Sequence, residues 1–535
     1  YASKLWFMFS TPILSNGGTT RGLPISCFLN YVEDSREGIT GHYTENAFLS
    51  SVGGGVGGSW SAIRSVGAKT SSGSESTGVI PFMKVVDAEM LAFSQGVTRR
   101  GSYAAYLDIS HPEIEEFLDV RKPTGGDVNR KSVNLHHGVV VSDEFMALIE
   151  GATREEGFDD SWDLIDPHTQ KVTKTVSAKT LWVKLIQNRV ETGEPYIMFG
   201  DTVQAGLPLC QAEKGFKVNH SNLCSEITLA TDAMRTAVCC LSSVNLEEYD
   251  EWKEHKDFIP DLIRMLDNVI SYFVENAPNT LSKAKFSAEM ERSLGLGAMG
   301  FHAYLQRHNI PFESPMAKGT NLKMFKHIKS EALNATKTLA MERGEAPDAV
   351  GHGVRNVHLL AVAPNASSSI ICGNTSPSIE PYRANAFTQK TKSGSSLLKN
   401  EYLEYALQEL DQDTDEVWKS IITNNGSVQH LDFLDEWTKD VFKTAVELDQ
   451  RWIIEMAADR QEEICQSQSL NIFFPANVSK QELHAIHMMA WKKKVKTLYY
   501  LRSEAIKRAE TVSDEALRQY IFESMDEEGC LACEG

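Results

Sequence analysis

Hydrophobic positions along the chain fall into short apolar runs separated by longer amphipathic stretches. The runs at 137–141 and 359–363 are typical of strands buried on both faces of a sheet. Patterns with helical spacing lie between such runs, at 178–190 and 257–275. This alternation predicts an α/β fold with a mainly parallel sheet.

The two ends of the chain have a different character. Residues 1–60 are rich in turns and end in the glycine run 53–58, which we interpret as close packing or a bulge. Beyond about residue 400 the pattern predicts mostly helices, at 401–411, 432–449 and 480–491. The tail, residues 523–535, is acidic and small, and we expect it to be disordered.

Composition and charge narrow the function classes. The chain has 535 residues and a net charge of −19, so the basic footprint of a protein that binds a nucleic acid polymer is missing. A nucleotide substrate stays possible, because backbone N–H groups and hydroxyls can hold phosphates. No apolar run reaches the roughly 18 residues of a membrane span, and nine cysteines without a visible secretory signal predict reduced thiols in the cytoplasm.

Three polar or reactive side chains stand at alternate positions in the segment 221–227. Asn222, Cys224 and Glu226 would share one face if this segment is extended. A thiol between an amide and a carboxylate suits hydrogen-atom or proton chemistry on a polyol. A single cysteine is otherwise more often a buried structural residue, and the sequence leaves both interpretations open.

The tail carries a pair of cysteines, Cys530 and Cys533. On a flexible arm such a pair can carry reducing equivalents, because an exposed thiolate exchanges readily with other disulfides. Half of a zinc site is an alternative, but zinc needs further ligands and no second CxxC exists. A chance pair is the third interpretation.

Other candidate groups have equally plain alternatives. Cys27 and the pair Cys239–Cys240 could be redox groups or ordinary core residues. Tyr499 and Tyr500 could pass an electron and a proton in steps, or belong to an aromatic core strand. The serine-rich turn 364–368 follows an apolar segment and could form an anion nest, or be a simple turn.

Histidine spacing argues against a metal centre. None of the fifteen histidines has a glutamate three residues before it, so the Glu-x-x-His pair of di-iron carboxylate proteins is missing. His484 and His487 have helical spacing but no evident carboxylate partner. We expect no metal site, and no radical generator assembled by this chain itself.

Taken together and in this order, the motifs resemble those of ribonucleotide reductase large subunits, over nearly the whole chain. The C-terminal motifs are similar to class I, which is served by a separate radical-generating small subunit. The motifs that carry the resemblance are Thr11-Pro12, Ser26-Cys27, Asn222-Leu-Cys224-Ser-Glu226, Cys239, Pro364 to Ser368, Tyr499-Tyr500 and Cys530-x-x-Cys533.

The resemblance implies a ten-stranded α/β barrel with a central finger loop, followed by a mainly helical C-terminal region and a flexible tail. The expected organisation is a barrel with catalytic and specificity sites in 1–400, a helical region with the tyrosine pair in 401–515 that completes the barrel domain, and a redox tail in 516–535. It also implies that this chain lacks the N-terminal ATP-cone found in many large subunits.

The resemblance assigns the chemistry to five side chains. Cys224 would become the thiyl radical that takes the ribose 3′-hydrogen. Glu226 would be the general base at the 3′-hydroxyl, and Asn222 would orient the substrate hydroxyls. Cys27 and Cys239 would supply two reducing equivalents and end as a disulfide. The adjacent Cys240 departs from the family pattern and leaves open which thiol of the pair faces the substrate.

The remaining roles follow in the same way. Tyr499 and Tyr500 would pass the radical to Cys224, and Cys530 and Cys533 would reduce the buried disulfide. The substrate phosphates would be held by Thr11, Ser26, Pro364, Asn365, Ala366, Ser367 and Ser368. The allosteric effector site would involve Asp34, Arg64, the loop 67–75, Gln95, Arg99 and Arg100.

The implied partners are a metal-containing small subunit that supplies the radical, a second copy of this chain, a thioredoxin- or glutaredoxin-type reductant, ribonucleoside diphosphates, and dNTP or ATP effectors. No cofactor would be bound permanently by this chain. A class II, adenosylcobalamin-dependent reductase is the first alternative, though it needs no tyrosine pair. A glycyl-radical reductase is disfavoured because the C-terminus has no Arg-x-x-Gly-Tyr-like segment. An inactive nucleotide-binding barrel is the alternative from another class.

Overall fold

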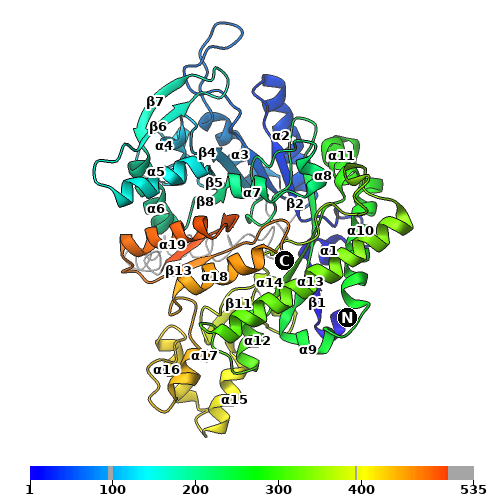
Figure 1. The fold of residues 1–535 in the computed structure, drawn as a ribbon, viewed down its shortest axis with the longest axis vertical. Helices are drawn as coiled ribbons and strands as arrows, with labels where there is room; N and C mark the ends of the chain where they lie inside the picture. Colours follow the sequence, from blue (N-terminus) through cyan, green and yellow to red (C-terminus); the bar gives the residue numbers. More distant parts are fainter. Residues whose placement is uncertain (94–100, 124, 392–393, 504–535) are drawn as a thin grey trace.

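The structure is a computed structural model that describes residues 1–93, 101–123, 125–391 and 394–503 (Figure 1). Nine strands form one curled sheet in the centre of the molecule. Its hydrogen-bonded order is β1 (Phe7–Phe9), β9 (Ala237–Asn245), β2 (Cys27–Tyr31), β3 (Gly55–Ser59), β4 (Tyr103–Asp108), β5 (His136–Val141), β8 (Tyr196–Phe199) and β14 (Thr497–Leu498), with β10 (Leu294–Met299) paired to β9.

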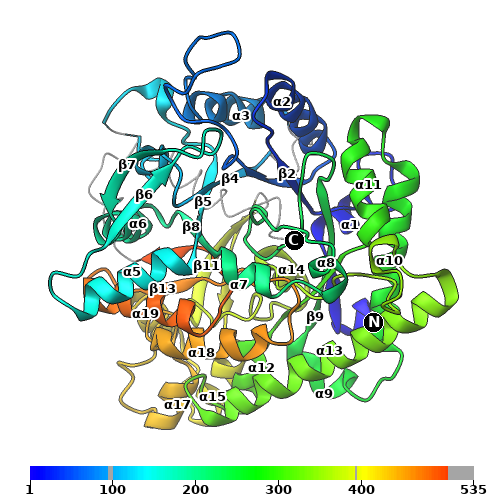
Figure 2. The same ribbon diagram turned by 45° about the horizontal axis from the view of Figure 1, so that its top comes forward.

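The strands β2, β3, β4, β5 and β8 run parallel, whereas β1 and β2 are antiparallel to β9 and β14 is antiparallel to β8. The longer helices lie around this sheet, some directly on it and others, such as α13 (Pro315–Arg343), packed on those helices. The rest are α2 (Arg36–Ser51), α3 (Ile80–Ala92), α5 (Asp143–Arg154), α6 (Ala178–Thr192), α10 (Phe258–Asn276), α11 (Ser282–Glu291), α18 (Gln450–Gln461) and α19 (Lys480–Lys492). Figure 2 shows α2 and α3 at one end of the molecule, and α10, α11 and α13 along one side.

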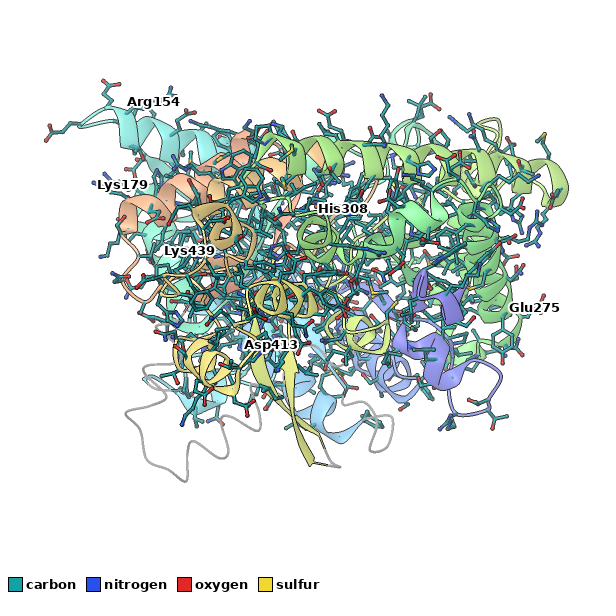
Figure 3. All side chains as sticks on the ribbon, turned by 90° about the horizontal axis from the view of Figure 1, so that it is seen from below. Arg154, Lys179, Glu275, His308, Asp413 and Lys439 are labelled. Atoms are coloured by element: carbon teal, nitrogen blue, oxygen red, sulfur yellow. The ribbon has the colours of Figure 1, made fainter. Side chains whose placement is uncertain are left out.

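The outer helices are amphipathic, and α10 illustrates why. Its apolar residues recur every three or four positions, so they form one stripe that packs on the sheet. That buried stripe consists of Phe258, Ile259, Leu262, Ile263, Leu266, Ile270 and Phe273. Arg154 and Glu275, which are labelled in Figure 3, point outward from the surface.

Short helices and hairpins connect these elements. The short helices are α1 (Thr11–Asn16), α4 (Ile114–Phe117), α7 (Gly200–Ala205), α8 (Leu209–Ala212), α9 (Tyr249–Trp252), α12 (Phe301–Arg307) and α14 (Ala366–Ile371). The two-stranded sheets pair β6 (Ser161–Ile165) with β7 (Val172–Ser177), β11 (Ala386–Thr391) with β12 (Gly394–Lys399), and β13 (Ile472–Phe474) with β15 (Leu501–Ser503).

A small helical lobe, formed by α15 (Glu401–Glu409), α16 (Asp415–Thr423) and α17 (Glu436–Val441), projects from the main body (Figure 1). It has a hydrophobic cluster of its own, which includes Leu403, Leu407 and Trp418. The elements after it, α18, α19 and β13, return to the main core. The C-terminal region therefore contains two different packing environments.

A long segment without regular structure crosses the inside of the curled sheet. It joins α8 to β9, and we call residues 213–236 the finger loop. Residues 220–231 of this loop are all buried. A buried irregular backbone needs partners for its polar groups, and the neighbouring segment 466–469 supplies several of them.

The α/β prediction is confirmed, and so are the helices expected at 178–190, 257–275, 401–411 and 480–491. Among the residues that the structure describes, the central sheet contains nine strands, whereas the resemblance implied ten. The expected strand at 359–363 makes only isolated bridges, from Leu360 to Leu296 and from Val362 to Gln468.

The prediction of a helix at 432–449 is wrong over most of that range. Only α17 forms there, and it ends at Val441. Farther on, the backbone N–H and hydroxyl of Thr444 both donate to Glu447 Oε2 at 2.8 Å. Such local bonds from a threonine compete with helix continuation.

Within the residues that the structure describes, no helix combines the length and the apolar composition that crossing a membrane requires.

Candidate active site

The finger loop brings its cysteine to the inner face of the sheet. Cys224 belongs to a buried cluster that also contains Cys27 of β2 and Cys239 of β9, and all three are fully buried. Cys27 and Cys239 are directly opposite each other in the antiparallel pairing of their strands. Opposite residues of such a pair have Cα atoms roughly 4.5–5.5 Å apart, which lies within the range that a disulfide spans.

The polar neighbours of Cys224 converge on the same place. Asn222 Nδ2 donates to Cys27 Sγ at 3.3 Å, and Cys27 Sγ lies 4.0 Å from Glu226 Oε1. The expected extended geometry of the segment is wrong, because residues 223–225 form a turn with Ser225 at φ 66°. The turn, rather than strand alternation, therefore brings Asn222 and Glu226 together at the cysteines.

β9 separates its two adjacent thiols by the alternation of a strand. Cys239 lies in the inner cluster, with Gln466 Nε2 donating to its sulfur at 3.5 Å. Cys240 belongs to the outer core under the helices. Burial raises the pKa of Cys239 well above its usual value, so the group is a neutral thiol that carries its hydrogen.

Close packing fixes the position of the finger loop. A Cβ atom on Gly57 of β3 would lie 2.2 Å from Ser221 O, so only glycine allows this approach. The Tyr106 hydroxyl of β4 donates to Asn222 O at 2.7 Å. His220 Nε2 lies 3.0 Å from Gly57 O, and burial lowers the pKa of His220 to about 4, so this histidine is neutral.

The segment 466–469 completes the site, and sequence reasoning missed it. Ser469 Oγ donates to Cys224 O at 2.6 Å and lies 3.2 Å from Glu226 Oε2. The Ser467 backbone N–H donates to Glu226 O at 2.8 Å. Gln466 to Ser469 are all polar and all buried, and no pattern in the sequence distinguishes them from an exposed polar run.

The tyrosine pair reaches the cysteine directly. The Tyr499 hydroxyl donates to Cys224 Sγ at 3.6 Å. The rings of Tyr499 and Tyr500 have centroids 4.1 Å apart. Tyr196 of β8 packs against both, at 4.7 Å and 5.2 Å, and was not anticipated from the sequence. The three tyrosines and Cys224 belong to one buried cluster, which connects Tyr500 to the thiol.

The residues expected to hold phosphates lie around two short helix starts. Thr11 is the first residue of α1, and the Ser26 hydroxyl donates to the hydroxyl of the preceding Ser10 at 3.2 Å. Asn365 precedes α14 with φ 57°, and its Nδ2 donates to Ser243 Oγ of β9 at 3.0 Å. The helix α14 packs against β1, the strand that leads to Ser10. It begins with Ala366, Ser367 and Ser368, two residues after Pro364.

The residues expected to bind an effector lie elsewhere, near the end of β2 and in the loop after β3. Arg64 Nε pairs with Asp34 Oδ2 at 2.9 Å, and Arg64 Nη1 donates to Lys69 O at 2.8 Å. Gln95, Arg99 and Arg100 lie outside the described residues, as do Cys530 and Cys533. Among the described residues, no group of three or more histidine, cysteine, aspartate or glutamate side chains could hold a metal ion.

A cavity of about 820 Å³ lies apart from the cysteine cluster. Cys210, Cys465 and Lys496 contribute to its lining, and Cys27, Cys224 and Cys239 do not. Lys496 Nζ donates to the carbonyls of Cys465 and Gln466, at 2.6 Å and 2.9 Å. The wall of this cavity therefore adjoins the segment that supports Cys224.

Comparison with known proteins agrees with this geometry. The chain matches the family described as the barrel domain of ribonucleotide reductase over residues 25–349 and 346–501. It is 50% identical to a putative ribonucleoside-diphosphate reductase large subunit of Frog virus 3, covering all of this chain and 91% of that protein. It is 43% identical to the large subunit of Invertebrate iridescent virus 3, with the same coverage.

Among solved structures, the chain is similar to the alpha subunit of a class Id ribonucleotide reductase from Actinobacillus ureae. The TM-score is 0.83 and the sequence identity 36%, over 94% of this chain and 88% of that chain. A curled α/β sheet with three buried cysteines on its inner face, one of them on an internal loop, is consistent with an oxidoreductase of the α/β-barrel class. Within that class, this chain belongs to the ribonucleotide reductase large-subunit family.

Proposed function

We propose that this chain is the catalytic subunit of a ribonucleoside-diphosphate reductase, which converts ribonucleotides to 2′-deoxyribonucleotides with a thiyl radical at Cys224. The observation that carries the proposal is the contact of Cys224 Sγ with the Tyr499 hydroxyl at 3.6 Å, inside a cluster that also contains Cys27 and Cys239. The sulfur is fully buried, and a radical needs protection from water and side reactions.

The chemistry balances with the side chains present. The Cys224 thiyl takes the 3′-hydrogen of the ribose, while Glu226 withdraws the proton of the 3′-hydroxyl and assists loss of the 2′-hydroxyl as water. Cys27 and Cys239 give two electrons and two hydrogens, one to the departing water and one to C2′, and become a disulfide, while Glu226 returns its proton to the 3′-oxygen. Cys224 returns the 3′-hydrogen and becomes a thiyl again. Asn222, which contacts Cys27, would orient the substrate hydroxyls.

The radical would arrive from a separate small subunit through Tyr500 and Tyr499. The ring contact of 4.1 Å between the two tyrosines supports this route. A tyrosine pair cannot generate a radical unaided, so we infer a metal-containing partner. The names of the class Id relative and the viral large subunits are consistent with a two-subunit enzyme.

Substrate phosphates would be bound by Thr11, Ser26 and the turn 364–368, where backbone N–H groups at the start of α14 and nearby hydroxyls are available. We propose that dNTP or ATP effectors bind at Asp34, Arg64 and the loop 67–75, together with Gln95, Arg99 and Arg100, at an interface between two copies of the chain.

Regeneration of the thiols would use Cys530 and Cys533, which a thioredoxin- or glutaredoxin-type protein would reduce in turn. The disulfide forms in a fully buried cluster, so a carrier must bring reducing equivalents to it. In this organisation residues 1–400 form the barrel, 401–515 complete it and 516–535 act as the redox tail. A cytoplasmic location, where thiols stay reduced, remains a prediction.

The test is reduction of CDP by the purified chain, with and without candidate small subunits. We expect turnover only with a small subunit, and complete loss in Cys224→Ser. Cys372→Ser is the matched control, because Cys372 is buried in a different cluster, and it should keep turnover. Full activity of Cys224→Ser would refute the proposal.

Two further outcomes separate the alternatives. Turnover without a small subunit on addition of adenosylcobalamin would identify a class II enzyme. Nucleotide binding without any turnover, under every radical source tried, would identify an inactive barrel.

A further inference from the structure

A buried charged cluster lies beside Tyr500, and the mechanism above does not use it. Glu194 precedes β8, while His136 and His137 are the first two residues of the neighbouring parallel strand β5. Their exposed fractions are 1%, 8% and 1%. Arg121 completes the cluster, with Nη1 3.4 Å from Glu194 Oε1. Buried charges of this kind need a full set of partners.

The hydrogen bonds define where the protons are. Glu194 Oε1 lies 2.6 Å from His136 Nδ1, and Glu194 Oε2 lies 3.0 Å from both Nδ1 and the backbone N of His137. Burial alone would raise the pKa of Glu194, but Arg121 and the two histidines outweigh it and hold the pKa well below its usual value. Glu194 is therefore a carboxylate, and each histidine points an Nδ1–H at it.

Only one of the two histidines also reaches the tyrosine pair. The Tyr500 hydroxyl oxygen lies 3.4 Å from His136 Nδ1, the nitrogen whose hydrogen Glu194 fixes. The ring of His137 instead contacts Phe117, with centroids 5.4 Å apart. Arg121 Nη1 lies 3.2 Å from the same nitrogen but donates to Leu135 O at 2.6 Å.

Aromatic packing holds this arrangement in place. The ring of Tyr196 stacks on His136, with centroids 6.1 Å apart and an interplanar angle of 17°. The same Tyr196 ring meets Tyr500 edge-on at 5.2 Å. This packing holds the His136 ring so that its one Nδ1–H lies near both Glu194 Oε1 and the Tyr500 oxygen.

We propose that the single Nδ1–H of His136 is shared between Glu194 Oε1 and the oxygen of Tyr500 when Tyr500 carries the radical, and that Glu194 acts as a positioning residue that fixes the tautomer and the orientation of the ring. This inference rests on the proposed relay. A donated hydrogen bond stabilises a phenoxyl oxygen, which has lost its own hydrogen and can only accept. Position 500 thereby becomes a defined stopping point for the radical.

The steps balance as hydrogen-atom transfers. A side-chain radical of the small subunit takes one hydrogen atom from the Tyr500 hydroxyl and leaves the phenoxyl. Tyr500 then recovers a hydrogen atom from Tyr499, and Tyr499 recovers one from Cys224. The His136 hydrogen stays on His136 throughout, so no proton is created or lost.

The experiment traps the radical at position 500. Tyr500 is replaced by 3-aminotyrosine, which oxidises more easily than tyrosine, in the full chain with its small subunit, substrate and effector. The histidines carry ¹⁵N, and pulsed electron paramagnetic resonance measures the coupling of the radical to histidine nitrogen. We expect a ¹⁵N coupling in the otherwise unaltered protein, its loss in His136→Phe, and its retention in His137→Phe.

His137→Phe is the matched control because His137 bonds the same carboxylate from the same strand. A trapped radical without ¹⁵N coupling in the otherwise unaltered protein would overturn the inference alone, and this arm needs no further substitution that could impair folding. A coupling that survives in His136→Phe would also overturn it. If nucleotide reduction proceeds and no radical ever forms at position 500, the relay itself is wrong, and the inference falls with it.

Discussion

Gly57→Ala tests whether the finger loop must be held at its present distance from the sheet. The added Cβ would lie 2.2 Å from Ser221 O and 2.8 Å from Asn222 Cα, where ordinary contact begins near 3.4 Å. Both obstacles are backbone atoms, so no side chain can rotate away. The loop must retreat by roughly 1 Å, a strain that costs about 1–3 kcal/mol in other overpacked cores.

That retreat displaces Cys224, two residues beyond Asn222, from its present position against Tyr499. A misplacement of about 1 Å in a reacting group can cost about 10²-fold in rate. We therefore expect kcat for CDP reduction to fall by about two orders of magnitude, while the KM for the nucleotide changes far less. Steady-state kinetics with the small subunit and urea unfolding measure the two effects separately.

Gly41→Ala is the matched control, because nothing lies within 4 Å of the Cβ that it would add in α2. This change should stabilise the protein by about 0.4–1 kcal/mol, since alanine restricts the unfolded chain more than glycine does, and should leave turnover intact. Unchanged kcat in a folded Gly57→Ala protein would refute the argument that close packing sets the reacting distance.

Three further substitutions or treatments follow from the same structure. Cys239→Ser should lower multiple-turnover reduction by at least about 10²-fold, whereas Cys240→Ser should keep it, and the reverse pattern in the same CDP assay would exchange their roles. Tyr106→Phe should lower the urea-unfolding free energy by about 1–3 kcal/mol, because a buried finger-loop carbonyl loses its donor; an unchanged midpoint would contradict this. Cys465 should be alkylated at a rate that levels off above about pH 7. Burial would raise its pKa, but contact with His358 lowers it to about 6, and mass spectrometry showing a rate that still climbs toward about pH 9 would contradict the shift.

The local pattern of apolar and polar residues was sufficient to predict the outer helices of the fold. The stripe of α10 and the start of α19 at a serine cap are encoded by neighbouring residues, so the sequence predicts these helices closely. The segment 359–363 has the composition of a strand, yet it makes only two bridges. Pairing depends on which segments arrive beside it, and no local pattern contains that information.

The same distinction applies to the site. The motif Asn222–Glu226 could be recognised, but its geometry could not, because the turn at Ser225 depends on contacts with Gly57 and Tyr106. Ser467 and Ser469 support Glu226 and Cys224 across more than 240 residues of chain. Only the folded topology brings such distant groups together, so sequence reasoning had no means to find them.

The register of β2 against β9 has a consequence for how a reductant could distinguish the protein with the proposed Cys27–Cys239 disulfide from the protein with two free thiols. Cys27 and Cys239 are neighbours across a single ladder, so joining their sulfur atoms asks almost no movement of the surrounding sheet. The disulfide and dithiol forms of the protein should therefore have nearly the same backbone structure and surface. The group that reduces the disulfide must therefore reach the two sulfur atoms, because the outer surface would be the same in the oxidised and the reduced protein.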